Sequence, residues 1–145
     1  MNESLLSLSE VLESLAEIGG RLLNGSFAEP SFCFKSVETD SRNVVEKTLF
    51  VPLVGERQDG HNFIQPAIDK GASVVFVSRD DELVHTFMER NPSVAFVYSS
   101  NTMTALQKAA GFYVRKFPNL IRCSVTGSSG KTTTKELAAS ILSQK

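Results

Sequence analysis

The residues best suited to chemistry form one short run of small and hydroxyl-bearing side chains that ends beyond a lysine: Thr126-Gly127-Ser128-Ser129-Gly130-Lys131-Thr132-Thr133. Glycines let the backbone turn so that consecutive N–H groups point at one anion. The positive end of a following helix adds to that attraction. Lys131 could reach a terminal phosphate, and the hydroxyl of Thr132 could join the ligands of Mg²⁺. The run therefore predicts a site for the phosphates of a nucleoside triphosphate.

The spacing of this run differs from the general P-loop pattern GxxxxGK[ST], because only Ser128 and Ser129 separate its two glycines. A Ser/Gly turn with a solvated lysine is the alternative interpretation. The flanking pattern favours phosphate binding, since a strand is expected over 121–125 and a helix from about Thr132 to the end. The run indicates phosphate binding without indicating which reaction follows.

The segment after the run is short. Only 14 residues follow Lys131, whereas a strand of this kind needs parallel neighbours that are reached through crossovers of a dozen or more residues. No second strand ending in an acidic Mg²⁺ ligand follows. We therefore expect the chain to stop inside its nucleotide-binding domain.

The overall composition is that of a folded protein, with 41% hydrophobic and 21% charged residues in 145. It excludes global disorder, and no apolar run of about 18 residues predicts a membrane span. The N-terminus has no signal-peptide pattern. Cys33 and Cys123 lack CxxC spacing, which disfavours a disulfide scaffold and a zinc site and favours a reducing cytoplasm.

Charge is distributed unevenly along the chain. Residues 1–100 hold 8 basic and 15 acidic side chains, whereas residues 101–145 hold 7 basic and a single acidic one. Such a step suggests two units, with a boundary near residue 100. The basic unit could prefer nucleic acid, an anionic membrane or a phosphorylated small molecule. Nucleic acid is the weaker choice, because the basic residues are scattered and no aromatic residues are interleaved for stacking on bases.

Helical spacing of leucines predicts an amphipathic helix over 5–18. Ser7 and Glu10 have the spacing of a capping box, and Gly19-Gly20 supplies a stop. An alternating strand is expected next, with one face formed by Phe32, Phe34 and Val37.

Short strands and helices then alternate. The runs 48–51, 73–77 and 94–97 are apolar, and the last two are continuous in the way of strands buried on both faces. A helix capped by Asn62 separates the first two runs, and one capped by Asp80 or Asp81 separates the last two. Because right-handed crossovers join such strands, we predict that 73–77 and 94–97 are adjacent and parallel.

A longer helix is expected from Ser100 or Asn101 to Pro118, with an apolar face of Met103, Leu106, Ala110, Tyr113 and Phe117. The predicted fold class is α/β. Residues 1–100 would form a small domain with a mixed or parallel sheet, and residues 101–145 would begin a P-loop ATPase-type α/β domain.

Three segments, in this order and spacing, resemble the Mur ligase family. The segment 39–51 is similar to the family's D-[ST]-R…LFVA element, through Thr39-Asp40-Ser41-Arg42 and Thr48-Leu49-Phe50-Val51. The segment 55–63 looks like its GxxxDGHxF loop, and 126–132 has its shortened ATP loop. The resemblance extends from about Ser7 to the end of the chain.

The resemblance implies an ATP-dependent, ADP-forming amide-bond ligase of peptidoglycan precursor synthesis, monomeric and cytoplasmic. Within the family, the chain looks most like the ligase that adds D-Ala-D-Ala to UDP-N-acetylmuramoyl tripeptide through an acyl phosphate. Two alternatives stay open: the ligase that adds the third amino acid to UDP-N-acetylmuramoyl dipeptide, and a non-catalytic UDP-sugar-binding module. The family's carbamylated lysine and acidic Mg²⁺ ligand would lie beyond Lys145, so this chain alone is expected to be inactive.

The resemblance also implies roles for individual residues. Lys131 would be catalytic, Thr132 would contact Mg²⁺, and 126–133 would bind ATP. The UDP end of the substrate would be bound by Ser41, Arg42, Glu56, Arg57 and Gln58. Three structural alternatives remain: an ion pair between Asp40 and Arg42 that closes the turn, a capping role for His61, and a surface or packed position for His85.

Overall fold

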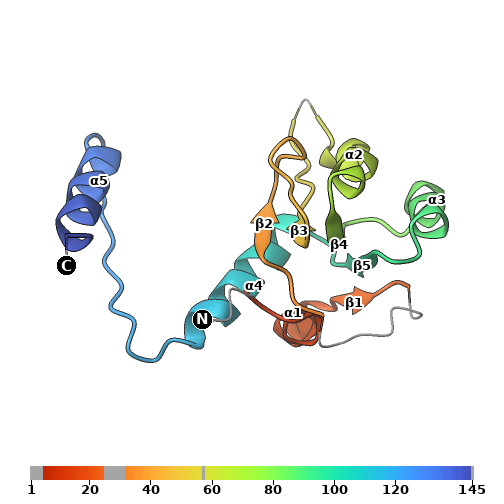
Figure 1. Cartoon of the computed structure of the whole chain (residues 1–145), viewed down its shortest axis with the longest axis horizontal. Helices are drawn as coiled ribbons and strands as arrows, with labels where there is room; N and C mark the ends of the chain where they lie inside the picture. The colour runs from red at the N-terminus through yellow and green to blue at the C-terminus, as the bar shows by residue number, and fades with distance from the viewer. Residues whose placement is uncertain (1–4, 25–31, 57, 145) are drawn as a thin grey trace.

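The structure is a computed structural model that describes residues 5–24, 32–56 and 58–144. Its elements, in chain order, are α1 (Leu8–Leu15), η1 (Ala16–Ile18), β1 (Arg21–Leu22), β2 (Ser36–Glu38), β3 (Thr48–Phe50), η2 (Gly60–Phe63), α2 (Ile64–Asp69), β4 (Ala72–Val77), α3 (Glu82–Arg90), β5 (Ala95–Tyr98), α4 (Thr102–Arg115) and α5 (Lys131–Leu142). Figure 1 shows a body built around the sheet, from which α4 leads away to α5. The α/β class predicted from the sequence is confirmed.

The sheet has the strand order β1-β5-β4-β3-β2. The strands β2 to β5 are parallel to one another, and β1 pairs antiparallel with β5. The predicted parallel pairing of β4 with β5 is confirmed, with Val74 opposite Ala95. Because the four parallel strands share a direction, the chain leaves all of them at one edge of the sheet. Connecting loops at that edge are therefore brought together.

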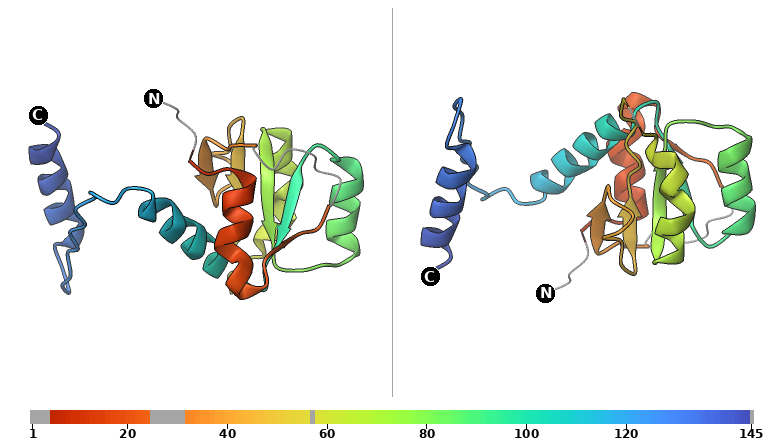
Figure 2. Two further views of the ribbon diagram at one scale, coloured as in Figure 1. Left: turned by 90° about the horizontal axis from the view of Figure 1, so that it is seen from below. Right: turned by 90° about the horizontal axis from the view of Figure 1, so that it is seen from above.

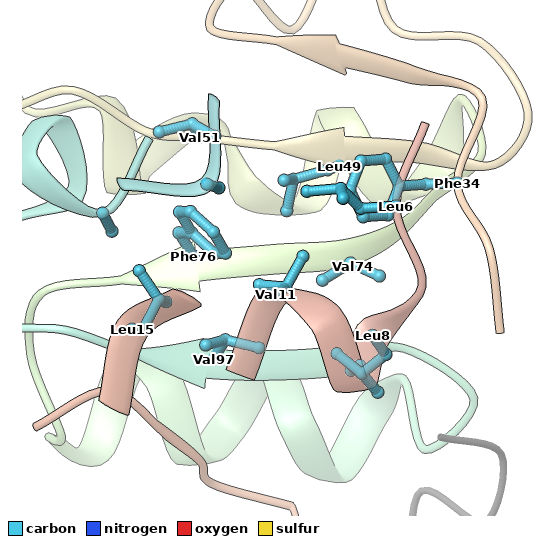
Figure 3. Packing of buried hydrophobic residues seen from close by; sticks show 13 residues of the cluster. Leu6, Leu8, Val11, Leu15, Phe34, Leu49, Val51, Val74, Phe76 and Val97 are labelled. Atoms are coloured by element: carbon cyan, nitrogen blue, oxygen red, sulfur yellow. The ribbon is translucent and has the colours of Figure 1, made fainter. Parts of the chain in front are cut away.

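Helices cover both faces of the sheet, as the two views of Figure 2 show: α1 and α4 on one face, α2 and α3 on the other. The alternation of side chains along β4 divides its residues between two cores. Val74 and Phe76 pack with Val11 and Leu15 of α1 (Figure 3), whereas Val75 packs on the opposite side among residues of α2 and α3. All of these side chains are buried, which explains the unbroken apolar run of this strand.

Local capping chemistry fixes three helix starts that the sequence predicts. Ser7 and Glu10 form a complete capping box at α1, Asp81 caps α3 by accepting from Val84 N at 3.1 Å, and Asn101 caps α4 by accepting from Thr104 N at 2.9 Å. The prediction that Asn62 caps the next helix is wrong. Asp59 caps the preceding turn η2 instead, and that turn runs directly into α2.

Three further expectations are corrected. The strand expected at Phe32 begins only at Ser36; Phe34 precedes it but is buried in the core. Residues 121–125 are irregular rather than a strand, because a strand requires backbone partners and no strand is paired with this segment within the described residues. The buried face of α4 is centred on Ala105 and Ala109, whose small side chains let the helix lie close to the sheet. Met103, by contrast, is 43% exposed.

The helix α4 is attached to the sheet body by packing and by charge. Lys108 pairs with Glu17 at 2.9 Å, and Lys116 pairs with Glu10 of α1 at 2.8 Å. Beyond it, every residue from 116 to 144 is exposed, and α5 lies apart from the sheet in all views (Figures 1 and 2). The division near residue 100 stays a prediction, with α4 joining the two regions.

Across the described ranges, no helix is both long and apolar enough to cross a membrane.

Candidate functional site

A cavity of about 440 Å³ lies at the carboxyl edge of the sheet, beside the loops that follow β2 and β3. Three residues predicted to bind the UDP end of the substrate line it: Ser41, Arg42 and Gln58. Glu56 is exposed and is not among the residues lining the cavity, and Arg57 lies outside the described residues. The remaining wall is formed by Thr39, Asp40, Leu53, Gly60 and Phe63.

Of these, Thr39, Leu53, Gly60 and Phe63 were not predicted as site residues. Thr39 begins the 39–51 motif, Gly60 and Phe63 belong to the 55–63 motif, and Leu53 lies between the two motifs. Their positions in the motifs were therefore visible in the sequence. The way in which the two loops converge on one cavity was not, because it depends on the pairing of β2 with β3.

The turn after β2 is closed by an ion pair. Arg42 donates from Nη2 to Asp40 Oδ2 at 2.6 Å and from Nε to both carboxylate oxygens at 3.0 Å, while its backbone N–H donates to Oδ1 at 2.9 Å. These bonds lower the pKa of the Asp40 carboxyl from 3.8 to about 2. Arg42 is nonetheless 85% exposed in its side chain, so its unused N–H groups are open to a ligand. The ion pair that the sequence suggested is therefore present, and both of its residues also line the cavity.

Gly60 brings two segments of the cavity wall into backbone contact. Its N–H donates to the carbonyl of Leu53 at 2.9 Å. A Cβ at this position would lie 2.6 Å from the Leu53 nitrogen and 2.7 Å from its carbonyl oxygen. A glycine is therefore required where the loop returns to the end of β3.

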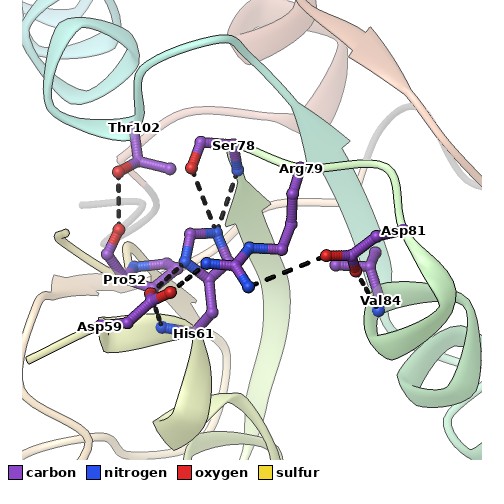
Figure 4. Close-up of polar contacts among 8 residues, drawn as sticks. All are labelled: Pro52, Asp59, His61, Ser78, Arg79, Asp81, Val84 and Thr102. Atoms are coloured by element: carbon purple, nitrogen blue, oxygen red, sulfur yellow. Dashed lines mark hydrogen bonds and ion pairs between the residues drawn. The ribbon is translucent and has the colours of Figure 1, made fainter.

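The side chain of His61 is fully buried behind the cavity. Its Nδ1 lies 2.6 Å from Asp59 Oδ1, and its Nε2 accepts from the backbone N–H of Ser78 at 3.1 Å (Figure 4). Because a backbone N–H can only donate, Nε2 must be unprotonated, which places the ring proton on Nδ1. His61 is therefore a structural residue that ties η2 to the end of β4. The predicted capping role is wrong, because Asp59 caps this turn and His61 lies within it.

Asp59 is the centre of a polar network (Figure 4). Its Oδ1 also accepts from the backbone N–H of His61 at 2.9 Å, and its Oδ2 pairs with Arg79. Burial raises the pKa of the Asp59 carboxyl, but the hydrogen bonds from His61 and the charge of Arg79 outweigh it and lower the pKa. Arg79 also lies 3.8 Å from the carboxylate of Asp81, the cap of α3.

The loop predicted to bind ATP leads directly into α5. Gly127 has φ of 152° and Gly130 has φ of 76°, a left-handed conformation that favours glycine. Gly130 is the residue before α5, and its carbonyl accepts from Thr134 N at 2.9 Å. The first N–H groups of the helix consequently have no intrahelical acceptor and face away from its body. This arrangement suits an anion.

Lys131 and Thr132 line an open cavity of about 290 Å³ together with Cys123, Val125 and Lys135. The ammonium group of Lys131 donates to the carbonyl of Gly127, so it is folded back over the loop. A Mg²⁺ ion requires oxygen ligands, and Thr132 offers one hydroxyl here. No group of three or more acidic, histidine or cysteine side chains placed for a metal occurs among residues 5–24, 32–56 and 58–144. Phosphate oxygens and further residues would have to complete the coordination.

His85 is an exposed partner of Asp80, with Nε2 and Oδ1 2.9 Å apart. His85 lines neither of the two cavities described above. The surface interpretation of this residue is confirmed.

Comparison with known proteins identifies the family of this chain. The model described as "Mur ligase family, catalytic domain" matches residues 34–121. A UDP-N-acetylmuramoyl-tripeptide–D-alanyl-D-alanine ligase from Treponema pallidum is 38% identical over 97% of this chain and 30% of its own length. Its counterpart from Bacillus subtilis is 32% identical over 93% of this chain and 28% of its own length. The chain thus spans less than a third of these curated relatives.

Solved structures agree with the sequence relatives. A crystal structure of MurF from Acinetobacter baumannii matches with a TM-score of 0.74 and 28% identity, over 95% of this chain and 27% of that one. The MurF ligase from Thermotoga maritima, solved in complex with ADP, matches with a TM-score of 0.54 and 32% identity, over 76% of this chain and 23% of that one. Since the family model covers more than half of the residues and the fold is shared with solved members, the chain belongs to the Mur ligase family.

Proposed function

We propose that this chain contributes the UDP-substrate site and the ATP loop of a ligase that joins D-Ala-D-Ala to UDP-N-acetylmuramoyl tripeptide, acting as a monomer in the cytoplasm. The observation that carries the proposal is the convergence of Ser41, Arg42 and Gln58 on one cavity, in a chain whose relatives bear that activity in their names. We further propose the division 1–100 for the UDP-substrate domain and 101–145 for the start of the ATP-binding domain.

The proposed reaction transfers the γ-phosphoryl group of ATP to the terminal carboxylate of the tripeptide, forming an acyl phosphate and ADP. The amine of D-Ala-D-Ala then attacks the acyl carbon, the amide bond forms, and inorganic phosphate leaves. Lys131 and the N–H groups at the start of α5 would oppose the charge on the transferred group. Residues 126–133 would cradle the remaining phosphates.

Thr132 would hold Mg²⁺ through its hydroxyl, and the ion when bound would offset charge on the phosphate oxygens. Lys131 would turn from the Gly127 carbonyl towards the γ-phosphate. Its present contact is within the loop itself, and this contact would be exchanged for one with the phosphate.

At the other end of the substrate, forked donors of Arg42 suit a diphosphate. The hydroxyl of Ser41 and the amide of Gln58 add neutral donors to the same wall. We also propose ligand contacts for Glu56 and Arg57, on the position of these residues in the 55–63 motif.

A two-ligand titration tests the proposed division of labour. Lys131→Ala should weaken the binding of an ATP analogue, and it should lower turnover in the full-length ligase by about 10²–10³. Binding of UDP-N-acetylmuramoyl tripeptide should be retained. Ser41→Ala and Arg57→Ala should show the opposite pattern. If Lys131→Ala lost the UDP substrate and Ser41→Ala lost ATP, the assignment of the two sites would be wrong.

The ligase of the preceding step is the second candidate, because a UDP-N-acetylmuramoyl-L-alanyl-D-glutamate–2,6-diaminopimelate ligase from Clostridium tetani is 31% identical over 96% of this chain. Supplying the full-length protein with either pair of substrates separates the two. Product formed only from UDP-N-acetylmuramoyl dipeptide and a diamino acid would favour this candidate. Binding without any product would instead favour a UDP-sugar-binding module.

A further inference from the structure

We propose that Arg79 is a positioning residue for the UDP-substrate cavity, acting through Asp59 on the loop that carries Gln58. The inference rests on the proposed function of this cavity. Arg79 follows β4 and does not line the cavity itself. No motif in the sequence pointed to it.

The argument begins with the place of Asp59 in the loop. Its two neighbours, Gln58 and Gly60, line the cavity, whereas its own carboxylate is engaged by His61 and Arg79. Fixing Asp59 therefore fixes the two cavity residues on either side of it. The backbone bond from Gly55 N to Gln58 O at 2.9 Å extends this constraint to Gly55.

The next step is the rigidity of the partners that hold Asp59. His61 is buried and anchored to the backbone of Ser78 at 3.1 Å, and Ser78 directly follows the central strand β4. Arg79 adds the second point of attachment, on the other carboxylate oxygen. Two contacts on different oxygens fix the orientation of the carboxylate, which a single contact would leave free to rotate.

Arg79 also connects the loop to α3. Its Nη1 lies 3.8 Å from Asp81 Oδ2, while Asp81 Oδ1 accepts from Val84 N. The guanidinium thus lies between two carboxylates, one on the loop and one at the start of α3. A prearranged wall binds a ligand more tightly than one that must be ordered on binding.

The test compares Arg79→Met, which keeps the aliphatic stem but removes the charge, with Arg79→Lys, which keeps the charge. Arg21→Met is the matched control, because Arg21 forms a surface ion pair with Asp80 at 3.0 Å and stacks over Tyr98, away from the cavity. In the full-length ligase, the KM for UDP-N-acetylmuramoyl tripeptide, the KM for ATP and kcat are measured for each variant, and thermal unfolding is recorded in parallel.

We expect Arg79→Met to raise the KM for the UDP substrate about tenfold, with the KM for ATP and kcat within about twofold of the wild type. Arg79→Lys should lie between the two, and Arg21→Met should match the wild type. An unchanged KM for the UDP substrate in Arg79→Met would overturn the inference, as would equal losses in all three constants.

If Arg79→Met fails to fold, Arg79→Lys decides: an increased KM for the UDP substrate at an unchanged unfolding temperature supports the inference, and an unchanged KM overturns it. A wild-type enzyme that does not use UDP-N-acetylmuramoyl tripeptide would contradict the proposed function itself. That outcome is distinct from a functional enzyme in which Arg79 has no effect.

Discussion

Asp40 and Arg42 form the most strongly perturbed ionisable pair near the cavity. The guanidinium of Arg42 donates side-chain hydrogen bonds to Asp40, its backbone N–H adds another, and together they lower the pKa of Asp40 to about 2. Because the folded-state pKa lies below the unfolded value, the contribution of this carboxylate to stability is complete above the unfolded pKa. It is lost as the pH falls through the folded pKa. With its pKa at about 2, the Asp40 carboxyl is therefore ionised and able to pair with Arg42 throughout the neutral range.

Replacing Arg42 should release this carboxyl group. In Arg42→Gln we expect the pKa of Asp40, followed by the carboxyl carbon signal in NMR, to rise from about 2 towards its ordinary value of 3.8. Arg21→Gln is the control and should leave this midpoint unchanged. Equal midpoints in Arg42→Gln and the wild type would show that the ion pair does not persist in solution.

Gly60 provides a second test at a single residue. An added Cβ would lie 2.6 Å from a backbone nitrogen, and backbone gives way less readily than the end of a flexible side chain. We expect Gly60→Ala to lower the free energy of unfolding by about 1–3 kcal/mol, measured by urea denaturation.

Gly111 is the matched control for this substitution. It lies within α4, with no atom within 4 Å of an added Cβ. Gly111→Ala should therefore raise the free energy of unfolding by about 0.5–1 kcal/mol, since alanine favours the helix. Equal effects of the two substitutions would contradict the close approach of Gly60 to Leu53.

Among the elements, α4 has the most consequential cap because this helix joins the sheet to the region that holds the predicted ATP loop. The side chain of Asn101 accepts from Thr104 N, and the nearby hydroxyl of Thr102 donates to the Pro52 carbonyl at 2.6 Å. The first turn of α4 is thereby fixed to the end of β3.

Removal of this cap should be measurable in the stability of the sheet body. We expect Asn101→Ala to lower the free energy of unfolding by about 1 kcal/mol. The adjacent Ser100→Ala should change it by less than about 0.5 kcal/mol. Denaturation followed by circular dichroism compares the two, and a loss in Ser100→Ala as large as in Asn101→Ala would show that capping is not the cause.

Local chemistry made several elements predictable from the sequence. The capping residues Ser7, Asp81 and Asn101 act within three or four positions of themselves, so their side chains and targets are both visible in a short window. The apolar run of β4 similarly announces a strand buried on both faces. The run 126–133, predicted to bind ATP, stands out in the sequence because its glycines, lysine and threonine are close together.

Other features depend on contacts that no short window contains. The capping role of Asp59 rather than Asn62 arises because His61 and Arg79 hold its carboxylate, and Arg79 is 20 positions away. The antiparallel strand β1 has only two residues, too few for a pattern to appear. The segment 121–125 has strand-like composition without a paired neighbour among the described residues, and composition alone does not form a strand.

For the whole molecule, the contrast lies between the sheet body and the region beyond α4. Ile141 is 70% exposed and Leu142 is 75% exposed, whereas Val74 and Val97 are completely buried. A 12-residue helix without tertiary packing has little stability of its own. The free energy of local unfolding should therefore be much smaller for α5 than for the strands of the sheet.

Hydrogen exchange followed by mass spectrometry measures this difference in the 145-residue chain. Amides of α5 should exchange nearly as fast as those of an unstructured peptide. Amides of β4 and β5 should exchange only through global unfolding. Protection of α5 as strong as that of β4 would mean that this helix packs against something in solution.

The loop between β3 and η2 has a closed base. Val54 and Asp59 form an antiparallel bridge, and Gly55 and Gln58 are joined by a backbone hydrogen bond. These bonds are made by main-chain atoms, and the carboxylate of Asp59 holds the loop in place. The fold therefore does not depend on the side chains at 56 and 58. Descendants of such a sequence can therefore exchange these two side chains, and with them the preference for a ligand, while inheriting an unaltered sheet.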